Sequence, residues 1–481
     1  MGVTTVAETL AAVLREDQLI RDPAQLRTYE CDGLTAHRVV PGLVALPESA
    51  SEVQAVVRAC NAAGAPFVAR GAGTGLSGGA LPVADGVVVS LARLDRILDV
   101  DLERGLAVVE PGVANLDVTR AVAADGFYYA PDPSSQQVCT IGGNVAENSG
   151  GAHCLKHGFT VNHVLAAQIV LPDGELVELS VWDEGPDLLG AFIGSEGTLG
   201  IATRLTLRLL RAPERVVTLL AGFRHTDDAG AAVSATIAAG VMPAAIEMMD
   251  AITMQAAEQA VHARYPDGCG AALIVELDGP EAQVEDDLAR IEAICGDAGA
   301  VEVRIASEAD DRATVWRGRK AAFAAMGRVS PDYYVQDGVV PRTKLPEVLR
   351  RIDELSREHG LRVGNVFHAG DGNLHPLVLY DGRVDGEAER AEQLAKRILE
   401  ACVEAGGSIT GEHGVGVDKA CAMPLMFGEP DLEVMQRLRR AFDPRGLANP
   451  GKIFPTPRLC GEVPGPYRAH PLEKAGLAER Y

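Results

Sequence analysis

Aromatic side chains are scarce in this chain, at 4% of its 481 residues, although 47% of the residues are hydrophobic. The core must therefore be built mainly from Ala, Val, Leu and Ile, and a chain of this length needs two or three domains. Positive charge is also scarce, because 44 Lys and Arg face 67 Asp and Glu, for a formal net charge of -23. Such a chain would repel the phosphates of nucleic acids and of anionic lipids.

Paired cysteines and long apolar runs are missing as well. The nine cysteines include no C-x-x-C pair, which predicts a reducing compartment and no iron–sulfur or zinc-ribbon site in this chain. No uncharged apolar stretch reaches the roughly 18 residues that a membrane-spanning helix needs. The N-terminal stretch MGVTTVAETLAAVLREDQLI lacks the basic start and apolar run of a signal peptide. We therefore expect a cytoplasmic protein that meets a membrane only through a partner.

The character of the predicted elements changes near Arg211. Before it, we predict a helix from Ser51 to about Ala63 with Ser51 as its N-cap, short strands, and a hairpin that turns at Pro172-Asp173-Gly174. After it, strands alternate with longer helices, which predicts an α+β fold with helices on one face of a sheet. These later helices are expected over 227–239, 252–264, 281–295 and 386–405.

A first glycine loop, ARGAGTGLSGGA at 69–80, carries five glycines. A Rossmann loop requires a helix to begin at the loop, so that its N-terminus meets the pyrophosphate. Here a proline and an Asp-Gly turn lead into a strand instead, and the helix comes before the loop. If this loop binds phosphate, the main-chain amides of a strand-to-strand connection must do it. The alternative is a flexible surface turn.

A long loop, YYAPDPSSQQVCTIGGNVAENSGG at 128–151, shows no helix or strand pattern and little charge. Loops of that length inside compact domains are usually functional or disordered. Its Ser, Thr, Asn and Gly residues offer many neutral donors, and a third glycine loop, GSEGTLGIAT at 194–203, adds more amides. Together the three loops suit a large, polar, partly aromatic ligand with a diphosphate.

These three loops resemble the flavin-binding domain of the vanillyl-alcohol-oxidase/PCMH superfamily, in its FAD-linked dehydrogenase branch. The resemblance continues through VWRGRKAAF, SPDYYVQDGVVPRTKLP, FHAGDGNLHP, GEHGVG and FDPRGLANPGKIFP, from about Arg21 to Cys460. Within that branch the chain is most similar to the flavin D subunits of bacterial glycolate oxidase, in YECDGLTA, YYAPDPSSQ, NVAENSGGAHCLKHG and PTPRLC.

The resemblance implies a domain order. An N-terminal helical segment at 1–37 would precede a PCMH-type FAD-binding domain at 38–213. An α+β FAD-linked-oxidase C-terminal domain at 214–455 would carry the substrate and metal sites, followed by a tail at 456–481.

The implied cofactor is FAD. Some members of the superfamily attach it to a histidine in the first glycine loop, and because residues 69–80 contain none, we expect non-covalent FAD. The candidate contacts lie in the three loops and near the C-terminal NPGKIF stretch. They are Arg70, Gly71, Gly73, Thr74, Gly75, Ser77, Gly78, Pro131, Asp132, Ser135, Thr140, Gly142, Gly143, Asn144, Asn148, Gly150, Gly151, Glu196, Gly197, Ile201 and Asn449.

The stretch HAGDGNLH places two histidines across a tight turn, where they could share a metal ion or be two ordinary loop residues. In the resembled family His368, His375 and the glutamate of GEHG, Glu412, bind a divalent metal: zinc, manganese or iron. Two His and one carboxylate with open positions are suitable ligands for such an ion. Asp371 would shape the turn or orient a ligand, and Asn373 would reach the substrate.

The resemblance gives His413 the role of general base, which suits an imidazole because its pKa lies near neutrality. If GEHG is extended, the side chains of Glu412 and His413 point to opposite sides. A substrate carboxylate needs a cation, and Arg342 and Arg317 are our candidates, since guanidinium binds carboxylate through two hydrogen bonds. The basic residues ranked below them are Lys344 and Arg319, and the alternative for each of the four is a solvated surface charge.

The implied activity is FAD-dependent oxidation of a small 2-hydroxy acid, glycolate or D-lactate, with electrons passed to a non-nicotinamide acceptor. The glycolate oxidase family works with a second flavin subunit and an iron–sulfur subunit, so we expect partners of that kind and no nucleic acid. The alternatives are a D-lactate or D-2-hydroxyglutarate dehydrogenase on the same scaffold, and a non-redox flavoenzyme of the alkylglycerone-phosphate synthase type. A metal hydrolase would leave the glycine loops unexplained.

Overall fold

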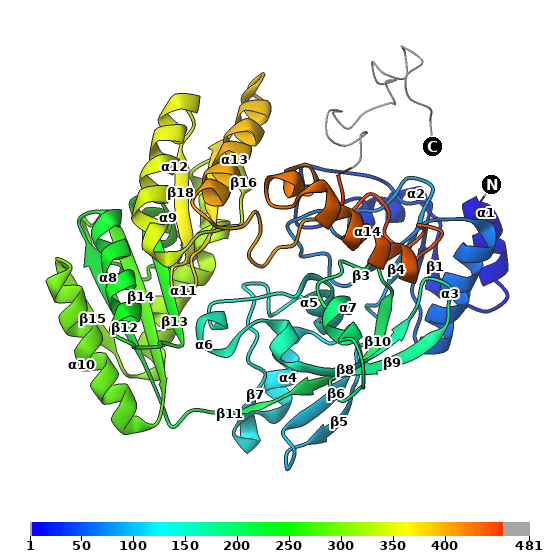
Figure 1. The fold of residues 1–481 in the computed structure, drawn as a ribbon, viewed down its shortest axis with the longest axis horizontal. Helices are drawn as coiled ribbons and strands as arrows, with labels where there is room; N and C mark the ends of the chain where they lie inside the picture. Colours follow the sequence, from blue (N-terminus) through cyan, green and yellow to red (C-terminus); the bar gives the residue numbers. More distant parts are fainter. Residues whose placement is uncertain (1, 456–481) are drawn as a thin grey trace. The chain divides into compact units, whose positions relative to one another are not determined.

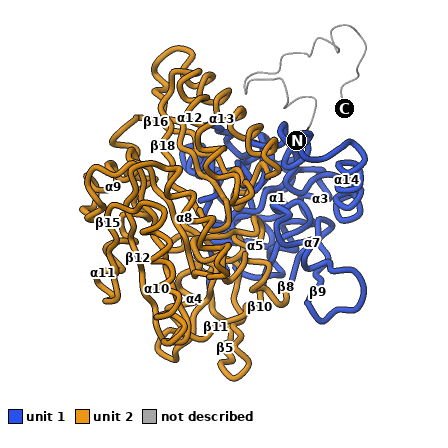
Figure 2. Tube along the Cα trace, turned by 60° about the vertical axis from the view of Figure 1, so that its left-hand side comes forward, with its two compact units in different colours: residues 1–95, 167–204, 414–481 blue, residues 96–166, 205–413 orange. Residues whose placement is uncertain are grey.

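The computed structural model describes residues 2–455, and the predicted tail at 456–481 lies outside the described residues. The chain divides into two compact units (Figure 2). Unit 1 contains Met1–Asp95, Ala167–Arg204 and Gly414–Tyr481, and unit 2 contains Arg96–Ala166 and Leu205–His413. Each unit is therefore assembled from segments that are distant in the sequence, and the domain boundaries expected at residues 38 and 214 stay predictions.

Unit 1 contains a four-stranded sheet in the order β1-β2-β4-β3. Its strands are β1 (Leu19–Ile20), β2 (Leu43–Ala45), β3 (Phe67–Arg70) and β4 (Val87–Ser90). The last three are mutually parallel. Helices α1 (Gly2–Leu10) and α3 (Ala50–Ala63) pack their apolar side chains against this sheet. The first glycine loop connects β3 to β4, so the predicted strand-to-strand connection is confirmed.

The start of α3 differs by two residues from its prediction. Its N-cap is Ser49, whose hydroxyl accepts a hydrogen bond from the amide of Glu52, and not Ser51. A serine followed three residues later by a glutamate is a sequence pattern of helix starts, so the signal was present two residues earlier. The helix ends at Gly64 as predicted, in the left-handed conformation with φ of +64°.

A second sheet has five strands in the order β5-β6-β10-β8-β9. They are β5 (Ile97–Asp101), β6 (Leu106–Val109), β8 (Val164–Val170), β9 (Leu176–Ser180) and β10 (Ile201–Arg208). Strands β8 and β10 each pass from one compact unit into the other. The predicted hairpin between β8 and β9 is confirmed, because the amide of Gly174 donates to the carbonyl of Leu171 at 2.8 Å.

The long loop at 128–151 is not free of secondary structure, and that prediction was wrong. It contains helix α5 (Ile141–Glu147), capped by the hydroxyl of Thr140. The glycines at its start hide the helical pattern, since glycine is a poor helix former. Tertiary contacts stabilise the helix instead: Ile141 and Val145 are buried, and the buried Asn144 accepts a hydrogen bond from Asn115 of α4 (Asn115–Val122) at 3.0 Å.

Unit 2 is dominated by a nine-stranded sheet whose main path is β15-β12-β14-β13-β18-β19-β17. Its strands are β12 (Arg215–Phe223), β13 (Ala245–Asp250), β14 (Ala271–Gly279), β15 (Glu302–Ala306), β16 (Asp332–Val335), β17 (Gly338–Val339), β18 (Val363–His368), β19 (Asn373–Leu374) and β20 (Pro376–Tyr380). The ribbon in Figure 1 shows long helices beside these strands.

Helices cover both faces of this sheet, so the prediction of helices on one face was wrong. The helices on one face are α8 (Thr226–Ala238), α10 (Glu281–Asp297), α12 (Leu345–His359) and α13 (Glu387–Glu404), and those on the other are α9 (Ala251–Val261) and α11 (Ala309–Ala325). The neighbouring residues Leu219 and Leu220 of β12 consequently belong to different core clusters. An uninterrupted apolar strand such as VVTLLAGF is typical of a sheet buried on both faces.

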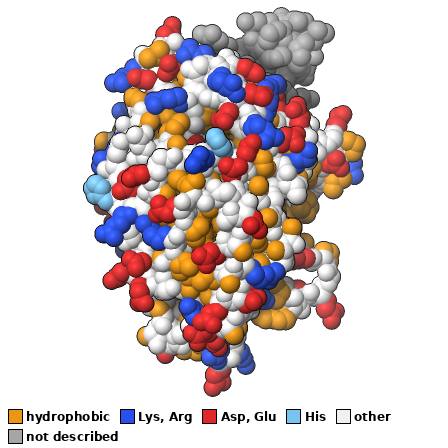
Figure 3. Space-filling model, turned by 90° about the vertical axis from the view of Figure 1, so that its left-hand side faces the viewer, with side chains coloured by type: hydrophobic (Ala, Val, Ile, Leu, Met, Phe, Trp, Pro, Cys, Tyr) orange, Lys and Arg blue, Asp and Glu red, His pale blue; other side chains and the backbone are white. Residues whose placement is uncertain are grey.

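None of the helices among residues 2–455 is both long and apolar enough to cross a membrane. Acidic and basic side chains are mixed over the face shown in Figure 3. Seven cysteines within the described part of the chain are free thiols. The last helix among residues 2–455 is α14 (Glu429–Phe442).

Candidate active site

The two histidines of HAGDGNLH lie at the ends of a tight turn between strands. His368 is the last residue of β18 and is paired with Asn373 of β19, and His375 follows β19 directly. Gly372 has φ of +81°, and a Cβ on it would lie 2.1 Å from the carbonyl oxygen of Val340. Only glycine fits there without a shift of the backbone, so the Asp-Gly pair of the motif fixes the turn that brings the histidines together.

His368, His375 and Glu412 form one compact group. Oε1 of Glu412 lies 3.2 Å from Nε2 of His368 and 3.1 Å from Nε2 of His375. The two imidazole rings are nearly perpendicular, with centroids 5.0 Å apart. Both histidines are buried, at 4% and 1% exposure. The structure therefore brings together the three residues that the sequence motifs suggested as metal ligands.

A buried ion pair supports this group from behind. Oε1 of Glu247, on β13, lies 2.7 Å from Nδ1 of His368. Its Oε2 accepts from the guanidinium of Arg319 on α11 at 2.7 Å. Sequence reasoning did not assign Glu247 and ranked Arg319 low. The signal was the strand AAIEMMD, where a single carboxylate interrupts an apolar run, because a buried charge needs a partner.

Charges in this group shift the pKa values of its members in opposite directions. Burial alone would lower the pKa of His368, but the carboxylates of Glu247 and Glu412 outweigh burial and raise it well above its usual value. Burial alone would raise the pKa of Glu412, but His368 and His375 outweigh it and hold the pKa well below its usual value. The carboxylates of Glu247 and Glu412 therefore favour a positive charge in this buried group.

The donor set suits a divalent ion. Ligands bound tetrahedrally to one zinc ion at about 2.1 Å lie about 3.4 Å from one another, which is close to the 3.2 and 3.1 Å from Glu412 to the two imidazole nitrogens. Because Nδ1 of His368 faces Glu247, a neutral ring would place its proton there and leave a lone pair on Nε2 facing the carboxylate of Glu412. Either a second proton or a metal cation is required between those two atoms.

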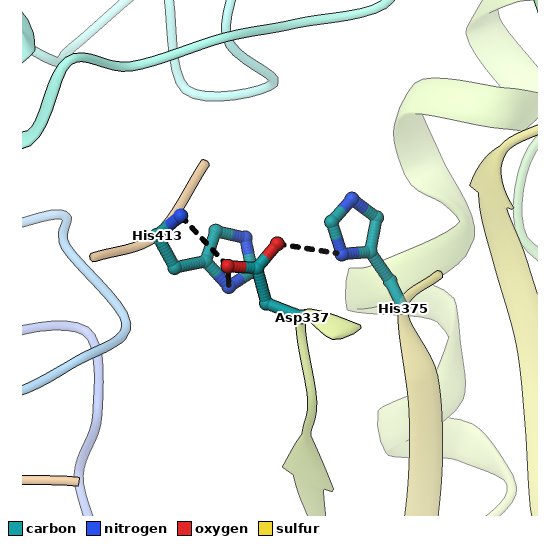
Figure 4. A group of neighbouring side chains, drawn as sticks. All are labelled: Asp337, His375 and His413. Atoms are coloured by element: carbon teal, nitrogen blue, oxygen red, sulfur yellow. Dashed lines mark hydrogen bonds and ion pairs between the residues drawn. The ribbon is translucent and has the colours of Figure 1, made fainter. Parts of the chain in front are cut away.

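His413 lies on the same side as Glu412, contrary to the alternation expected for an extended segment. Its ring stacks on the ring of His375 with centroids 5.0 Å apart and an interplanar angle of 11°. Nε2 of His413 is 3.9 Å from Oε1 of Glu412. The chain bends between the two residues because three main-chain amides of this loop point at Asp337, which is completely buried. Figure 4 shows one of these amides, that of His413, and its hydrogen bond to Asp337.

A cavity of about 590 Å³ opens beside the histidine turn and is lined by residues including Arg342, Asp371, Cys154 and Ser408. Nη1 of Arg342 donates to the carbonyl of Gly370 in the turn at 3.1 Å. Burial raises the pKa of Asp371 to about 6. Asn373 is buried, and its Oδ1 has no hydrogen-bond partner among residues 2–455. Arg342 and Asn373 therefore keep polar capacity for a ligand.

The other basic candidates are located differently. Arg317 lies on the exposed side of α11, with Nη2 3.5 Å from the hydroxyl of Thr314. Lys344 is exposed and pairs with Glu347 at 2.8 Å. The structure does not bring either of them into contact with the His368 group.

The first and third glycine loops belong to unit 1 and share a buried polar network. The amide of Asn449 donates to the carbonyls of Gly79 and Glu196 at 2.9 and 2.6 Å. The carboxylate of Glu196 accepts from the amides of Val415 and Gly416, both at 2.7 Å. The side chains of Asn449 and Glu196 are thus already used inside the fold. Ile201 is a core residue, which leaves only its main chain for a cofactor.

Several features of these loops fit a phosphate-bearing cofactor. Gly73 and Gly78 have φ of +71° and +75°, and the position of a Cβ on Gly75 is open space. The hydroxyls of Ser77 and Ser195 are buried without a hydrogen-bond partner within the described residues. Arg70 lies against Gly73 and donates to the carbonyl of Cys31 at 2.8 Å.

The long loop belongs to unit 2, and its end reaches the metal candidates. A Cβ on Gly150 would lie 2.7 Å from Oε2 of Glu412. Gly142 packs against Pro111, and Asn148 and Gly151 have positive φ. The other predicted cofactor contacts are divided between the two units. The long loop contains Pro131, Ser135 and Gly143, and the glycine loops of unit 1 contain Gly71, Thr74 and Gly197. Three predicted contacts already use their side chains within the fold. The hydroxyl of Thr140 caps α5, the buried amide of Asn144 accepts from Asn115, and the amide oxygen of Asn148 accepts from the main-chain amide of Val161.

One half-buried histidine, two residues after this loop, was not singled out from the sequence. Nδ1 of His153 lies 2.7 Å from Asp132, and its Nε2 lies 3.0 Å from Glu276 of β14. Glu276 also accepts from Thr218 and from the indole of Trp316 at 2.7 and 2.5 Å. Burial opposes the charge on His153, but the two carboxylates outweigh it and raise its pKa well above the usual value.

Comparison with known proteins assigns the family. Residues 41–180 match the model described as FAD binding domain, and residues 212–453 match the model described as FAD linked oxidases, C-terminal domain. The chain belongs to the FAD-linked oxidase family. This FAD-linked oxidase is a flavoprotein oxidoreductase, so the predicted resemblance and the predicted FAD cofactor are confirmed.

Curated relatives of this FAD-linked oxidase match over most of their length. Glycolate oxidase subunit GlcD of Escherichia coli (strain K12) is 48% identical over 448 residues, covering 92% of this chain and 90% of that protein. The subunit of the same name from Bacillus subtilis (strain 168) is 37% identical, covering 93% and 96%. D-lactate dehydrogenase of Anaerostipes hadrus is 34% identical, covering 86% and 89%.

Solved structures confirm the PCMH-type fold. p-Cresol methylhydroxylase matches with a TM-score of 0.79 at 18% identity, covering 94% of this chain and 96% of that one. An alkyldihydroxyacetonephosphate synthase matches with a TM-score of 0.73 at 19% identity, covering 92% and 84%. At these identities the likeness concerns the fold alone.

Proposed function

We propose that this FAD-linked oxidase oxidises a small 2-hydroxy acid, with glycolate as the first candidate, to the corresponding 2-oxo acid. The support comes from relatives named glycolate oxidase subunit at 48% and 37% identity over more than nine-tenths of the chain. The FAD-binding domain would occupy 38–213 and the substrate domain 214–455. The observation that carries the proposal is the stacking of His413 on His375 beside Glu412.

His368, His375 and Glu412 are the proposed ligands of a divalent ion: zinc, manganese or iron. Their support is the set of donor distances and the buried negative charge around them. A bound divalent ion would supply a Lewis acid that polarises the substrate hydroxyl. Glu247 keeps the ring of His368 in the orientation that leaves Nε2 available, as carboxylates commonly do for metal-ligating histidines.

The remaining groups would bind the substrate and move its proton. Arg342 would hold the carboxylate through two hydrogen bonds, from a place beside the histidine turn. Oδ1 of the buried Asn373 would accept from the substrate. A ring nitrogen of His413 would take the hydroxyl proton, a task for which imidazole is suited.

FAD would be held non-covalently by the three loops and would accept the hydride. Electrons would then leave to a non-nicotinamide acceptor, because the first glycine loop lacks the Rossmann pattern that binds nicotinamide dinucleotides. The relatives are named as subunits, and we propose partners of the kind expected above: a second flavin subunit and an iron–sulfur subunit. A cytoplasmic protein bound to the inner membrane only through such partners is the matching location.

D-lactate is the second candidate substrate. One relative at 34% identity is named D-lactate dehydrogenase, and the cavity of about 590 Å³ beside Arg342 is larger than glycolate needs. A hydrophobic pocket discriminates a methyl group only about 10- to 200-fold, so both acids are expected to react.

The experiment is an assay with an artificial electron-accepting dye on the purified yellow protein, with glycolate, D-lactate, L-lactate and D-2-hydroxyglutarate. Glycolate or D-lactate should reduce the dye, and each reactive acid should bleach the flavin band when added without oxygen. Reaction with D-2-hydroxyglutarate alone would assign that alternative. If none of the acids bleaches the flavin, the 2-hydroxy-acid proposal is wrong.

A pair of arginine variants tests the carboxylate site. Arg342→Ala should raise KM about 10- to 100-fold, because a hydrogen bond to a charged group contributes roughly 1.5–3 kcal/mol. Arg317→Ala is the matched control, since its side chain is exposed on α11, and its KM should stay within about twofold of the wild type. The reverse result would assign the role to Arg317.

A further inference from the structure

Asp337 lies between β16 and β17 and is completely buried. It belongs neither to the site residues predicted from the sequence nor to the groups of the proposed chemistry. Its Oδ2 accepts from the hydroxyl of Thr410 at 2.6 Å and from the amides of Gly411 and His413, both at 2.9 Å. The amide of Glu412 lies 3.2 Å from each carboxylate oxygen. One carboxylate thus receives the amides of three consecutive residues of the GEHG loop.

This arrangement determines the path of the loop. Three successive N–H groups that converge on one anion form a concave turn, and that turn allows the side chains of Glu412 and His413 to face the same group. Gly411 is packed so closely that a Cβ would lie 2.4 Å from the side chain of Asn373. Without the carboxylate, these buried amides would have no partner, and the bend would lose its cause.

The second oxygen of Asp337 faces a histidine. Oδ1 lies 3.8 Å from Nδ1 of His375 (Figure 4), and that nitrogen has no hydrogen-bond partner in the described part of the chain. Nε2 of the same ring faces Glu412. A carboxylate on the Nδ1 side favours the tautomer with its proton on Nδ1, which leaves Nε2 free to bind a metal. Glu247 lies on the same side of His368 but closer, at the hydrogen-bond distance of 2.7 Å from its Nδ1.

We propose that Asp337 is a positioning residue that fixes the Glu412–His413 turn through main-chain amides and sets the tautomer of His375. The inference rests on the proposed metal site and extends it to a residue that would touch neither metal nor substrate. In this arrangement the turn and both histidine rings are organised before an ion arrives, because protein groups alone hold them.

A competing reading is a second ion held by Asp337, His375 and His413, whose ligand atoms lie within 4.8 Å of one another. The carboxylate is already occupied by hydrogen-bond donors on Oδ2, which leaves little capacity for a cation. Metal analysis separates the two readings: one ion per chain supports the positioning role, and two ions per chain would overturn it.

The main test is Asp337→Asn, measured by competition with graded chelators using zinc and manganese salts. The new amide must direct its NH₂ group either at the converging amides or at Nδ1 of His375. In the second case it favours the tautomer with the proton on Nε2, which blocks that ligand atom. We expect metal affinity to fall about 10- to 100-fold and kcat to fall more than KM changes, while FAD content stays at the wild-type level.

The matched control is Asp332→Asn, five positions earlier on β16, where the exposed carboxylate accepts from the amide of Gly382 at 3.0 Å. This variant should bind metal and turn over as the wild type does. Equal losses in both variants would mean general destabilisation of this sheet edge, and unchanged affinity in Asp337→Asn would show that Asp337 positions nothing. Either result overturns the proposal.

Hydrogen exchange of the wild-type holoenzyme provides a measurement that needs no variant. Amides of residues 411–413 should stay protected after chelation, because Asp337 and not the metal holds them. Rapid exchange of that peptide once the metal is removed would overturn the proposal. If the wild type binds no divalent ion at all, the proposed metal site fails, but this exchange measurement still decides whether Asp337 holds the turn.

Discussion

His153 should be a permanent cation that joins the long flavin loop to the large sheet of unit 2. Both ring nitrogens face carboxylate oxygens, of Asp132 at 2.7 Å and of Glu276 at 3.0 Å, so both must carry a proton. The perturbation is His153→Gln, which keeps a similar size but removes the charge. Hydrogen bonds to charged groups contribute roughly 1.5–3 kcal/mol each, and removing one partner of a buried ion pair costs about 3–5 kcal/mol.

The lower end of the cost of breaking a buried ion pair applies to His153, because its side chain keeps 25% exposure. We expect a loss of about 3 kcal/mol, which corresponds to a fall in the unfolding temperature of roughly 6–12 °C for a unit of this size. Circular dichroism melting curves at a series of pH values measure it. The control is His225→Gln, since His225 is exposed and caps α8 without a side-chain hydrogen bond.

The pH dependence has a definite sign. The folded-state pKa of His153 is raised, so its contribution is complete below its unfolded value of about 6.5 and is lost as pH rises through the folded value. The pKa values of Asp132 and Glu276 are lowered, so their contributions are present above about pH 4 and are lost as pH falls through the folded values. The difference between wild type and variant should therefore peak at about pH 5–6.5 and shrink in alkali.

A variant as stable as the wild type at about pH 6 would refute the doubly hydrogen-bonded cation. A difference that stays undiminished in alkali would show that packing, and not charge, is responsible.

Further predictions concern the cofactors and the base. Acid precipitation should release all of the yellow colour into the supernatant, because the first glycine loop has no histidine for covalent attachment; flavin kept in the pellet would contradict this. His368→Ala should lower bound metal and turnover with FAD content near normal, and parallel loss of flavin would mean that the turn is only structural. His413→Ala should reduce turnover about 10²- to 10⁴-fold with metal and FAD retained. The residual activity should rise with pH, and near-normal turnover would exclude His413 as the base.

Local patterns predicted the parts of this fold that local physics determines. The first glycine loop was read as a strand-to-strand connection because Pro82 and the Asp85-Gly86 pair exclude a helix there, and β4 begins at Val87. Helix α5 was missed because its glycines weaken the local pattern, while its stability comes from contacts such as Asn144 with Asn115. These two residues are 29 positions apart, so the local sequence around α5 does not predict their contact.

The candidate site shows the same division. The ligand candidates His368 and His375 stand in one short motif with glycines that fix their turn, so sequence alone could place them together. Glu247 lies on another strand and Asp337 in the connection between two others, and only the folded sheet brings them to the histidines. A single acid within an apolar strand marks a residue that needs a partner, but it does not reveal which partner. Arg319, two positions from the favoured Arg317, differs from it only by the side of the helix it occupies.

Unit 1 is assembled from three segments that are distant in the sequence, and this has a consequence for synthesis on the ribosome. The first glycine loop is completed by residues made some 370 positions later, since Asn449 donates to Gly79 and the ammonium of Lys452 donates to the carbonyl of Leu81. At cellular rates of translation that interval is on the order of tens of seconds. A nascent chain therefore lacks these two hydrogen bonds until its last segment emerges, so we expect flavin loading to be a late event and a stalled chain to remain colourless.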